Sequence, residues 1–383
     1  MIENGFTYIA LLLFIASSIL YFTVKTQWKI FDYLPAVVII YFAVMILSGL
    51  DIWQKNEEIK AYANGFKTSL LYSMIFLMLS QANLKDIASL GTKMLLSYFL
   101  ATLSITIGFI VMFALLHNSF SNDAYMTFSS LNGCWIGGTG NMIAIQKALS
   151  IEDSQMGNIL ITDAFNYTLL VIFLLWSVSI ATKFDLWSKA GKLHVKEPIV
   201  SEQESKAIDF SSLFLLLGLS IMISSLSQII ASYMPTTSFL SRSTWEVLIA
   251  TLFGIAGSFT FVRHMAGLGE LGNIMLYFII ALIASQASFA QLSDAPLYIF
   301  AAFLVMVIHL SLMVIFAKIF KLNLAMIGIA SVANVGGPAS ASIVASAYDK
   351  SLVPFGVIMG LIGYMIGTFI GIGVSTILKV IAQ

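Results

Sequence analysis

Residues 135–141 read WIGGTGN, and residues 334–340 read NVGGPAS, 199 positions further along the chain. Each glycine pair interrupts a long apolar stretch, at the same relative place in each half. An earlier stretch also recurs: 71–87 reads LYSMIFLMLSQANLKDI, and 276–292 reads LYFIIALIASQASFAQL, 205 positions later. Paired breaks in two matching halves predict an internal repeat with a binding site where the breaks meet.

The composition restricts the class of protein. Of the 383 residues, 59% are apolar and 10% are charged, whereas soluble domains carry about 25% charged residues. We therefore expect an all-α polytopic membrane protein whose main partner is the lipid bilayer, in a bacterial plasma membrane. The formal net charge of zero gives no reason to expect a nucleic-acid partner. Four His and one Cys, scattered along the chain, indicate neither a structural metal site nor a disulfide framework.

Ten apolar runs are long enough to span a bilayer, which takes about 20 residues. They fall at 6–24, 33–50, 67–82, 93–116, 157–182, 211–233, 245–260, 271–289, 296–319 and 352–380. The only long polar stretch, 183–210, divides them into two sets of five. We therefore expect repeat one at 1–182, a polar cytoplasmic linker at 183–210, and repeat two at 211–383.

The two Gly-containing segments, 124–148 and 324–348, allow two topologies. If they cross the membrane, each repeat has six crossings and the halves are parallel. If they enter and leave on one side, each repeat has five crossings and the halves are inverted. The second arrangement places the larger share of Lys and Arg on the side of the linker, as the positive-inside rule requires of the cytoplasmic side. We expect two inverted repeats of five transmembrane helices, each with a Gly-rich broken or re-entrant helical hairpin whose tip is buried.

The broken segments supply the candidate binding groups. A break leaves unpaired N–H groups at one helix start, which attract anions, and unpaired C=O groups at the other end, which suit Na⁺. The expected substrate-binding residues are Asn132, Gly137, Gly138, Thr139, Gly140, Asn141, Asn334, Gly336, Gly337, Pro338, Ser340 and Ser342. The competing interpretation is structural: small residues let membrane helices pack closely, and Pro338 would only kink a helix.

Asp163 is the strongest single candidate for an ion-coupling residue, because intramembrane carboxylates are costly and usually line an ion or proton path. Thr162 and Asn166 adjoin it, so we expect these three residues to couple an ion, with Na⁺ held by Thr139, Asp163 and Asn166. A protonated Asp163 would instead carry H⁺. The competing interpretation leaves Asp163 near the membrane surface in a structural role. His309 is favoured as a neutral, hydrogen-bonded residue over a proton shuttle.

The motif pair, with GGTG at 137–140 and GGPA at 336–339, resembles the YjcL-like membrane family of unknown function. More broadly it is similar to the sodium/glutamate and sodium/citrate symporter folds, and to the superfamily of bile-acid symporters and cation/proton antiporters. The resemblance covers essentially the whole chain, although Ala339 departs from the GGxG pattern of the symporters. It implies a transport domain containing the hairpins, a scaffold domain against which it moves, and a homodimer formed through the scaffold.

These observations together predict a secondary active transporter working by alternating access. The expected solute is small and anionic or zwitterionic: an amino acid, a short peptide or a carboxylate. The expected coupling ion is Na⁺ or H⁺, and no cofactor other than Na⁺ is expected. A channel, or a regulatory membrane protein without coupled transport, is the alternative. An enzyme is disfavoured, because the sequence contains no cluster of acids, His or Cys with ligand spacing.

Overall fold

The structure, a computed structural model, describes residues 1–26, 36–54, 56–81, 87, 90–191, 208–237, 241–287 and 294–383. These residues are almost entirely helical, and their only β-pairing is a single bridge between Ile2 and Trp53. The predicted all-α class is confirmed. The central part of the predicted linker, 192–207, lies outside the described residues.

The first half contains α1 (Gly5–Thr26), α2 (Ala36–Gly49), α3 (Glu57–Ser80), α5 (Gly91–Leu116), α6 (Ala124–Gly137), α7 (Thr139–Ala148), α8 (Met156–Ser177) and α9 (Ala181–Ser188). The second half contains α10 (Phe210–Ser232), α11 (Arg242–Gly257), α12 (Leu268–Ala284), α13 (Ala295–Phe320), α14 (Leu324–Tyr348) and α15 (Val353–Ile381). Each of the ten predicted apolar runs corresponds to one of these helices. Seven helical segments of the described chain are long and apolar enough to cross a membrane.

The start of α3 differs from the sequence-based expectation. The helix begins at Glu57, ten positions before the predicted run, because Asn56 caps it: the Asn56 side chain accepts a hydrogen bond of 2.8 Å from the Ile59 N–H. Its first turn is polar, with Glu57 and Glu58, so a hydropathy pattern does not reveal it. Part of the predicted linker is also helical, since α9 runs from Ala181 to Ser188.

Hairpin 1 is formed by α6 and α7, which meet at Gly138. Gly138 has φ of +78°, a backbone conformation that side-chain-bearing residues rarely adopt. Beyond it the chain turns back, since the Ser130 hydroxyl on α6 donates to the Met142 carbonyl on α7 at 2.9 Å. A straight helix would place residues 12 positions apart about 18 Å apart. The segment 124–148 is therefore a helical hairpin.

Hairpin 2 is α14 itself, which is broken at Gly337, where φ is +67° and Pro338 follows. A Cβ on Gly328 would lie 3.2 Å from the Tyr348 hydroxyl. A straight helix would separate residues 20 positions apart by about 30 Å. The segment 324–348 therefore also folds back on itself. Both segments have the shape that the five-crossing topology needs, and the inverted orientation of the halves stays a prediction.

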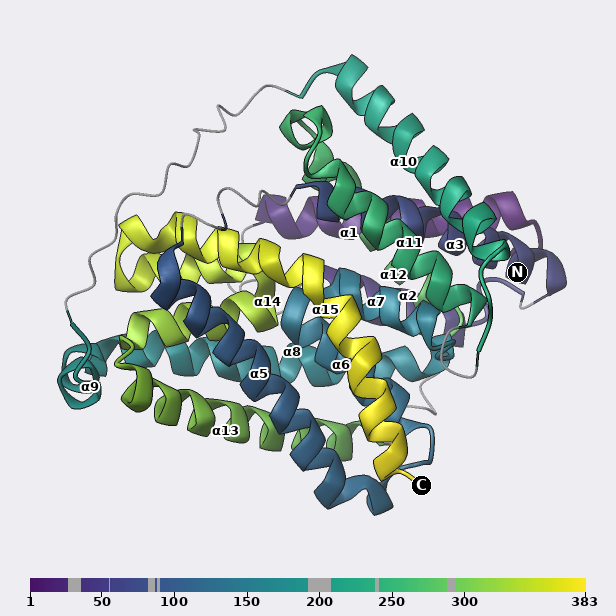
Figure 1. Cartoon of the computed structure of the whole chain (residues 1–383). Coiled ribbons are helices and arrows are strands. Elements are labelled where there is room, and N and C mark those ends of the chain that lie inside the picture. The colour runs from purple at the N-terminus through teal and green to yellow at the C-terminus, as the bar shows by residue number, and fades with distance from the viewer. Residues whose placement is uncertain are drawn as a thin grey trace.

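The helices form two bundles (Figure 1). The companion bundle contains α1, α2, α3, α10, α11 and α12, and the hairpin bundle contains α5, α6, α8, α13, α14 and α15. The returning arm of hairpin 1, α7, lies between them and packs against α3 and α11 as well as α6 and α15. Because α1 and α10 are the least buried of the long apolar helices, they provide much of the outer apolar surface of the companion bundle.

Helices of the two halves pair with one another in a regular way. The last helix of each half packs against the hairpin of the other: α15 against α6, and α8 against α14. The equivalent helices α3 and α12 are in contact, as are α5 and α13. On the latter pair, the Ser104 hydroxyl lies 2.7 Å from His309 Nδ1, and these residues are 205 positions apart. This is the offset between 71–87 and 276–292, whereas the two hairpins are offset by 199, so nearly equivalent positions meet there.

Candidate functional site at the hairpin tips

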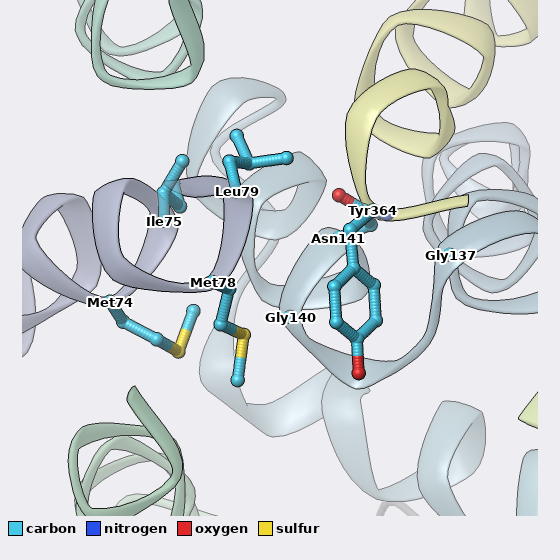
Figure 2. Close-up of a pocket in the computed structure, with 8 residues that line it drawn as sticks. All are labelled: Met74, Ile75, Met78, Leu79, Gly137, Gly140, Asn141 and Tyr364. Atoms are coloured by element: carbon cyan, nitrogen blue, oxygen red, sulfur yellow. The ribbon is translucent and has the colours of Figure 1, made fainter. Parts of the chain in front are cut away.

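The tips of the two hairpins meet at one aromatic ring, that of Tyr364 on α15. A Cβ on Gly138 would lie 3.6 Å from the Tyr364 ring, and a Cβ on Gly337 would lie 3.7 Å from its hydroxyl. The two positive-φ breaks, 199 residues apart in sequence, thus flank a single side chain. Figure 2 shows this ring beside Gly137 and Asn141 of hairpin 1.

A second tyrosine, Tyr167 on α8, contacts the tip of hairpin 2. Its hydroxyl lies 2.7 Å from Ser340 Oγ, and its ring packs against Gly336. Tyr167 and Tyr364 each stand 11 positions after the first residue of their helix (167 − 156 and 364 − 353). Sequence reasoning assigned neither tyrosine to the site. Their equal spacing becomes visible only once the helix starts are known, because the apolar runs in the sequence begin at 157 and 352.

Asp163 lies at the tip of hairpin 1, one turn before Tyr167 on α8. The Trp135 indole N–H donates to Asp163 Oδ1 at 2.9 Å. The Cys134 thiol is within hydrogen-bonding reach of both Asp163 and Thr139. Because α8 begins at Met156, Asp163 is two turns inside this helix. The structure thus brings Asp163 and Thr139 together around Cys134.

Several other predicted residues are engaged in packing. Asn141 donates to the Gly363 carbonyl at 3.1 Å and accepts from the Thr368 hydroxyl at 2.7 Å, so it fastens hairpin 1 to α15. A Cβ on Gly137 would lie 2.1 Å from the same Gly363 carbonyl. The structural interpretation of small residues as packing contacts therefore accounts for Gly137, and Asn141 has both amide atoms occupied.

In hairpin 2, Asn334 has a similar packing role. Its side-chain oxygen accepts from the Thr102 hydroxyl on α5 at 2.7 Å, and its amide donates to the Ala330 carbonyl at 2.9 Å. Ser342 donates to the Pro338 carbonyl within its own helix arm, at 2.8 Å. Asn334 and Ser342 thus have their hydrogen bonds within the protein, whereas Gly337 and Ser340 lie at the tip.

His309 is held between two serines. Its Nδ1 lies 2.7 Å from Ser104 Oγ, and its Nε2 lies 3.0 Å from Ser331 Oγ. The side chain is buried at the contact of α13 with α5 and α14. With both ring nitrogens partnered by hydroxyl groups, a neutral imidazole is fully satisfied there, which is the structural interpretation that the sequence favoured.

A small cavity lies beside the tip of hairpin 1, with a volume of about 10 Å³, which is room for about one water molecule. It is lined by Met74, Ile75, Met78, Leu79, Gly137, Gly140, Asn141 and Tyr364. Figure 2 shows the α3 side chains facing the tip across this space. One wall is therefore apolar and belongs to the companion bundle. The other contains the start of α7, where the Asn141 and Met142 N–H groups donate to the Gly138 carbonyl, so those of Thr139 and Gly140 are the ones without an acceptor in the helix. The cavity is too small for an organic solute in this conformation, but its walls pair apolar side chains with the N–H end of a helix, which attracts anionic groups.

Comparison with known proteins gives two matches. The model of a family described as "Protein of unknown function (DUF819)" matches residues 10–381. An "Uncharacterized membrane protein YjcL" of Bacillus subtilis (strain 168) is 24% identical over 355 residues, covering 86% of this chain and 87% of that protein. The matches therefore extend over both bundles and both hairpins, and they agree with a multi-pass membrane protein.

Proposed function

The chain belongs to the DUF819 family of unknown function, and from that premise we propose that it is a secondary active transporter for a small anionic or zwitterionic organic solute. The observation that carries the proposal is the meeting of two glycine-broken hairpin tips at Tyr364. Non-helical backbone at membrane depth is tolerated where it is buried in protein or lines a cavity. Hairpin 1 meets both conditions, with a buried first arm and a cavity at its tip.

If movement of the bundles enlarges it, the cavity gives each part of the solute a partner. The anionic group would bind the unpaired N–H groups at the start of α7, where the helix dipole is favourable. The apolar part would pack against Met74, Met78 and their neighbours on α3. An amino acid, a short peptide or a carboxylate with an aliphatic portion has this combination of groups.

The position of the cavity supports an alternating-access mechanism. Its two walls belong to different bundles, because α3 is in the companion bundle and the hairpin tip is in the other. Movement of one bundle against the other would therefore open and close it. We propose that the companion bundle is the scaffold, and that it forms the contact of a homodimer within the bilayer.

Asp163 is proposed to couple the solute to Na⁺ or H⁺, because this carboxylate lies at the tip of hairpin 1 beside Trp135 and Thr139. If Na⁺ is the coupling ion, Asp163→Asn removes charge from the ion site and weakens Na⁺-dependent solute binding severely. If H⁺ is the coupling ion, Asn mimics the protonated acid. Solute exchange then survives, while uphill uptake and its pH dependence disappear.

The experiment is uptake into proteoliposomes with a panel of radiolabelled amino acids, dipeptides and dicarboxylates. Each solute is tested under an inward Na⁺ gradient, an inward H⁺ gradient, and neither. A transporter accumulates at least one solute above its outside concentration under one of the two gradients. Equilibration of solutes without accumulation under any gradient would instead support a channel and would contradict the proposal.

A further inference from the structure

Unpartnered buried polar atoms are concentrated in one part of the described chain. Neither amide atom of Asn132 has a hydrogen-bond partner, and the same holds for the Asn158, Thr162 and Asn166 side-chain oxygens. Among the described residues only the Tyr41 hydroxyl, on α2, shares this condition. Each unmade hydrogen bond costs about 1–3 kcal/mol. A cluster of them in a native structure indicates a bound ion or water.

Three of these residues share one face of α8. Asn158, Thr162 and Asn166 are spaced four positions apart, so their side chains follow one another on successive turns. The three are at most 7% exposed. Successive side chains of this set are about 6 Å apart along the helix axis. An ion bound to Thr162 can therefore also contact either Asn158 or Asn166, but not both. The face therefore offers two adjacent binding positions.

Asn132 on hairpin 1 lies at the height of these positions. Thr127 on α6 donates to Gln155 at 3.2 Å, and Trp135 donates to Asp163 at 2.9 Å. In each pair the two residues are 28 positions apart. The two helices α6 and α8 therefore run parallel, and a residue on α6 is level with the residue on α8 that is 28 positions later. Asn132 is therefore level with position 160, between Asn158 and Thr162, and it is fully buried.

Asn166 shows which kind of ligand is missing. Its amide nitrogen donates to the Thr162 carbonyl at 2.9 Å and to the Ile299 carbonyl on α13 at 3.3 Å. A flipped amide would place its oxygen against two carbonyl oxygens, so the orientation is determined. The Asn166 side-chain oxygen is thus a buried acceptor without a donor. Such an oxygen needs a cation or a hydrogen-bond donor.

The chemistry of the whole set favours a monovalent hard cation. The unpartnered atoms are amide and hydroxyl oxygens, with one amide nitrogen, that of Asn132. The adjacent acid is Asp163, which supplies a single negative charge. Among the described residues, no group of three or more His, Cys, Asp or Glu side chains could hold a metal ion. Oxygen ligands with little net charge suit Na⁺ better than a divalent or transition metal.

We propose that Thr162 and Asn166 bind Na⁺ beside Asp163, and that Asn158 and Asn132 lie at the adjacent position of the same site. This site lies on the face of α8 that contacts α13, and its ligand set differs from one built on Thr139 at the hairpin tip. The inference deepens the proposed function by naming the coupling ion. It rests on that function only for the role of the ion in transport, because Na⁺ binding can be measured without any solute.

The test is thermal unfolding of the purified protein in detergent, in NaCl against choline chloride and KCl at constant ionic strength. We expect Na⁺ to raise the midpoint of the parent protein. In Thr162→Val and Asn166→Leu, the Na⁺ concentration needed for this rise should increase at least tenfold. In choline, Thr162→Val should melt no lower than the parent, because it removes a hydroxyl that has no partner.

The matched control is Thr168→Val on the same helix, whose hydroxyl donates to the Ala164 carbonyl at 2.8 Å. It should keep the full response to Na⁺. A parent-like response in both site variants would overturn the proposal. The proposal would also be overturned if the unfolding midpoint of the parent did not change with Na⁺ while Thr162→Val had a lower midpoint in choline. The unpartnered atoms of the site would then bind water instead of Na⁺.

The proposed function and this site fail in different experiments. Na⁺-dependent stabilisation without accumulation of any solute would contradict the proposed transport function and would still support the Na⁺ site. Uphill uptake driven by H⁺ alone, with no effect of Na⁺ on stability, would contradict the Na⁺ site and would still support the proposed transport function.

Discussion

The two hairpins share a backbone break but differ in how firmly their returning arms are held. In hairpin 1 the returning arm is buried from Asn141 to Gln146. The carbonyl at its end, Ala148, accepts hydrogen bonds from Ser241 and from Thr244, the latter at 2.9 Å. In hairpin 2 the returning arm exposes 58% of Ile343, and Ala339, Ser346 and Ala347 are also exposed. A repeated sequence motif has thus produced the same bend in two different packing environments.

This difference assigns different tasks to the hairpins. Hairpin 1 is bonded to α15 through Asn141 and to the companion bundle at Ala148, so it links the two bundles in this conformation, and movement of one bundle against the other has to break one of these contacts. The returning arm of hairpin 2 packs closely on α15, where a Cβ on Gly360 would lie 2.4 Å from the Pro338 nitrogen. Its end is bonded to α8, since the Tyr348 hydroxyl lies 2.8 Å from Ser177 Oγ. Hairpin 2 thus packs on α15 and α8 and leaves its other side exposed, so we expect it to move with less loss of contacts than hairpin 1.

The largest expected effect is at the two breaks. A β-branched residue cannot adopt the positive φ of Gly138 or Gly337 without strain of about 1–3 kcal/mol. Gly138→Val and Gly337→Val should each abolish solute uptake in proteoliposomes. We expect Gly138→Val also to lower the unfolding midpoint more than Gly337→Val, because its arm is packed on both sides.

The control for both variants is Gly218→Val on α10, where an added Cβ would meet nothing within 4 Å. It should insert, fold and transport normally. Normal uptake by Gly138→Val at parent-like expression would contradict the assignment of the site to the hairpin tips.

The next largest difference is expected between two acids, each of which follows one of the hairpins. Asp153, after hairpin 1, pairs with Lys67 of α3 at 2.5 Å, and both side chains are at most 16% exposed. Asp153→Ala leaves Lys67 unpaired, and breaking a buried pair costs about 3–5 kcal/mol. Asp349, after hairpin 2, is exposed and accepts from the Ser351 N–H at 2.8 Å, so Asp349→Ala should cost much less. Denaturant or thermal unfolding in detergent measures both, and equal losses would remove the distinction.

The pH dependence of Asp349 has a definite sign. The backbone N–H and then the side chain of Ser351 hold the pKa of this carboxyl group below its usual value. Because the pKa is lower in the folded protein, the contribution to stability is present above the ordinary pKa of Asp and is lost as the pH falls through the folded value. The unfolding midpoint of Asp349→Ala should therefore approach that of the parent in strong acid.

A third contrast is between Asn141 and Ser340, which occupy equivalent positions 199 residues apart. Asn141→Ala removes two buried hydrogen bonds and takes its acceptor from the buried Thr368 hydroxyl, while the Gly363 carbonyl keeps its bond within α15, so we expect a loss of about 2–3 kcal/mol. Ser340→Ala removes one hydrogen bond to Tyr167 and should cost about 1 kcal/mol. A larger loss of stability for Ser340→Ala than for Asn141→Ala would show that hairpin 2, and not hairpin 1, is held more firmly.

The smallest effect needs no mutation. Amide hydrogen exchange followed by mass spectrometry should show faster exchange in 339–348 than in 139–148, because local opening of the less packed arm breaks fewer contacts. A difference of about 1–2 kcal/mol in opening free energy corresponds to roughly 5–30-fold in rate. Equal protection of the two arms would show that exposure does not translate into mobility.

The sequence predicted much of this architecture because its signals are local. Apolar length identified ten helices, and the paired glycines identified both breaks, since positive φ is a requirement of one residue. The partners of the breaks depend on tertiary packing. No local pattern shows that Asn141 binds α15, that Asn334 binds Thr102, or that Tyr364 lies between both tips. Asp163 was recognised from its cost in an apolar helix, whereas the unpartnered state of Asn132 required knowledge of every neighbour.

The contact between Ser104 and His309 has a consequence for the history of the chain. In a dimer of two identical half-length proteins, a residue on the symmetry axis meets a second copy of itself. Two serines or two histidines would then have faced each other at this point. Joining the halves in one polypeptide removes that restriction, so each side of the axis can change alone. The serine–histidine pair therefore needs two halves of different sequence, which this single polypeptide supplies.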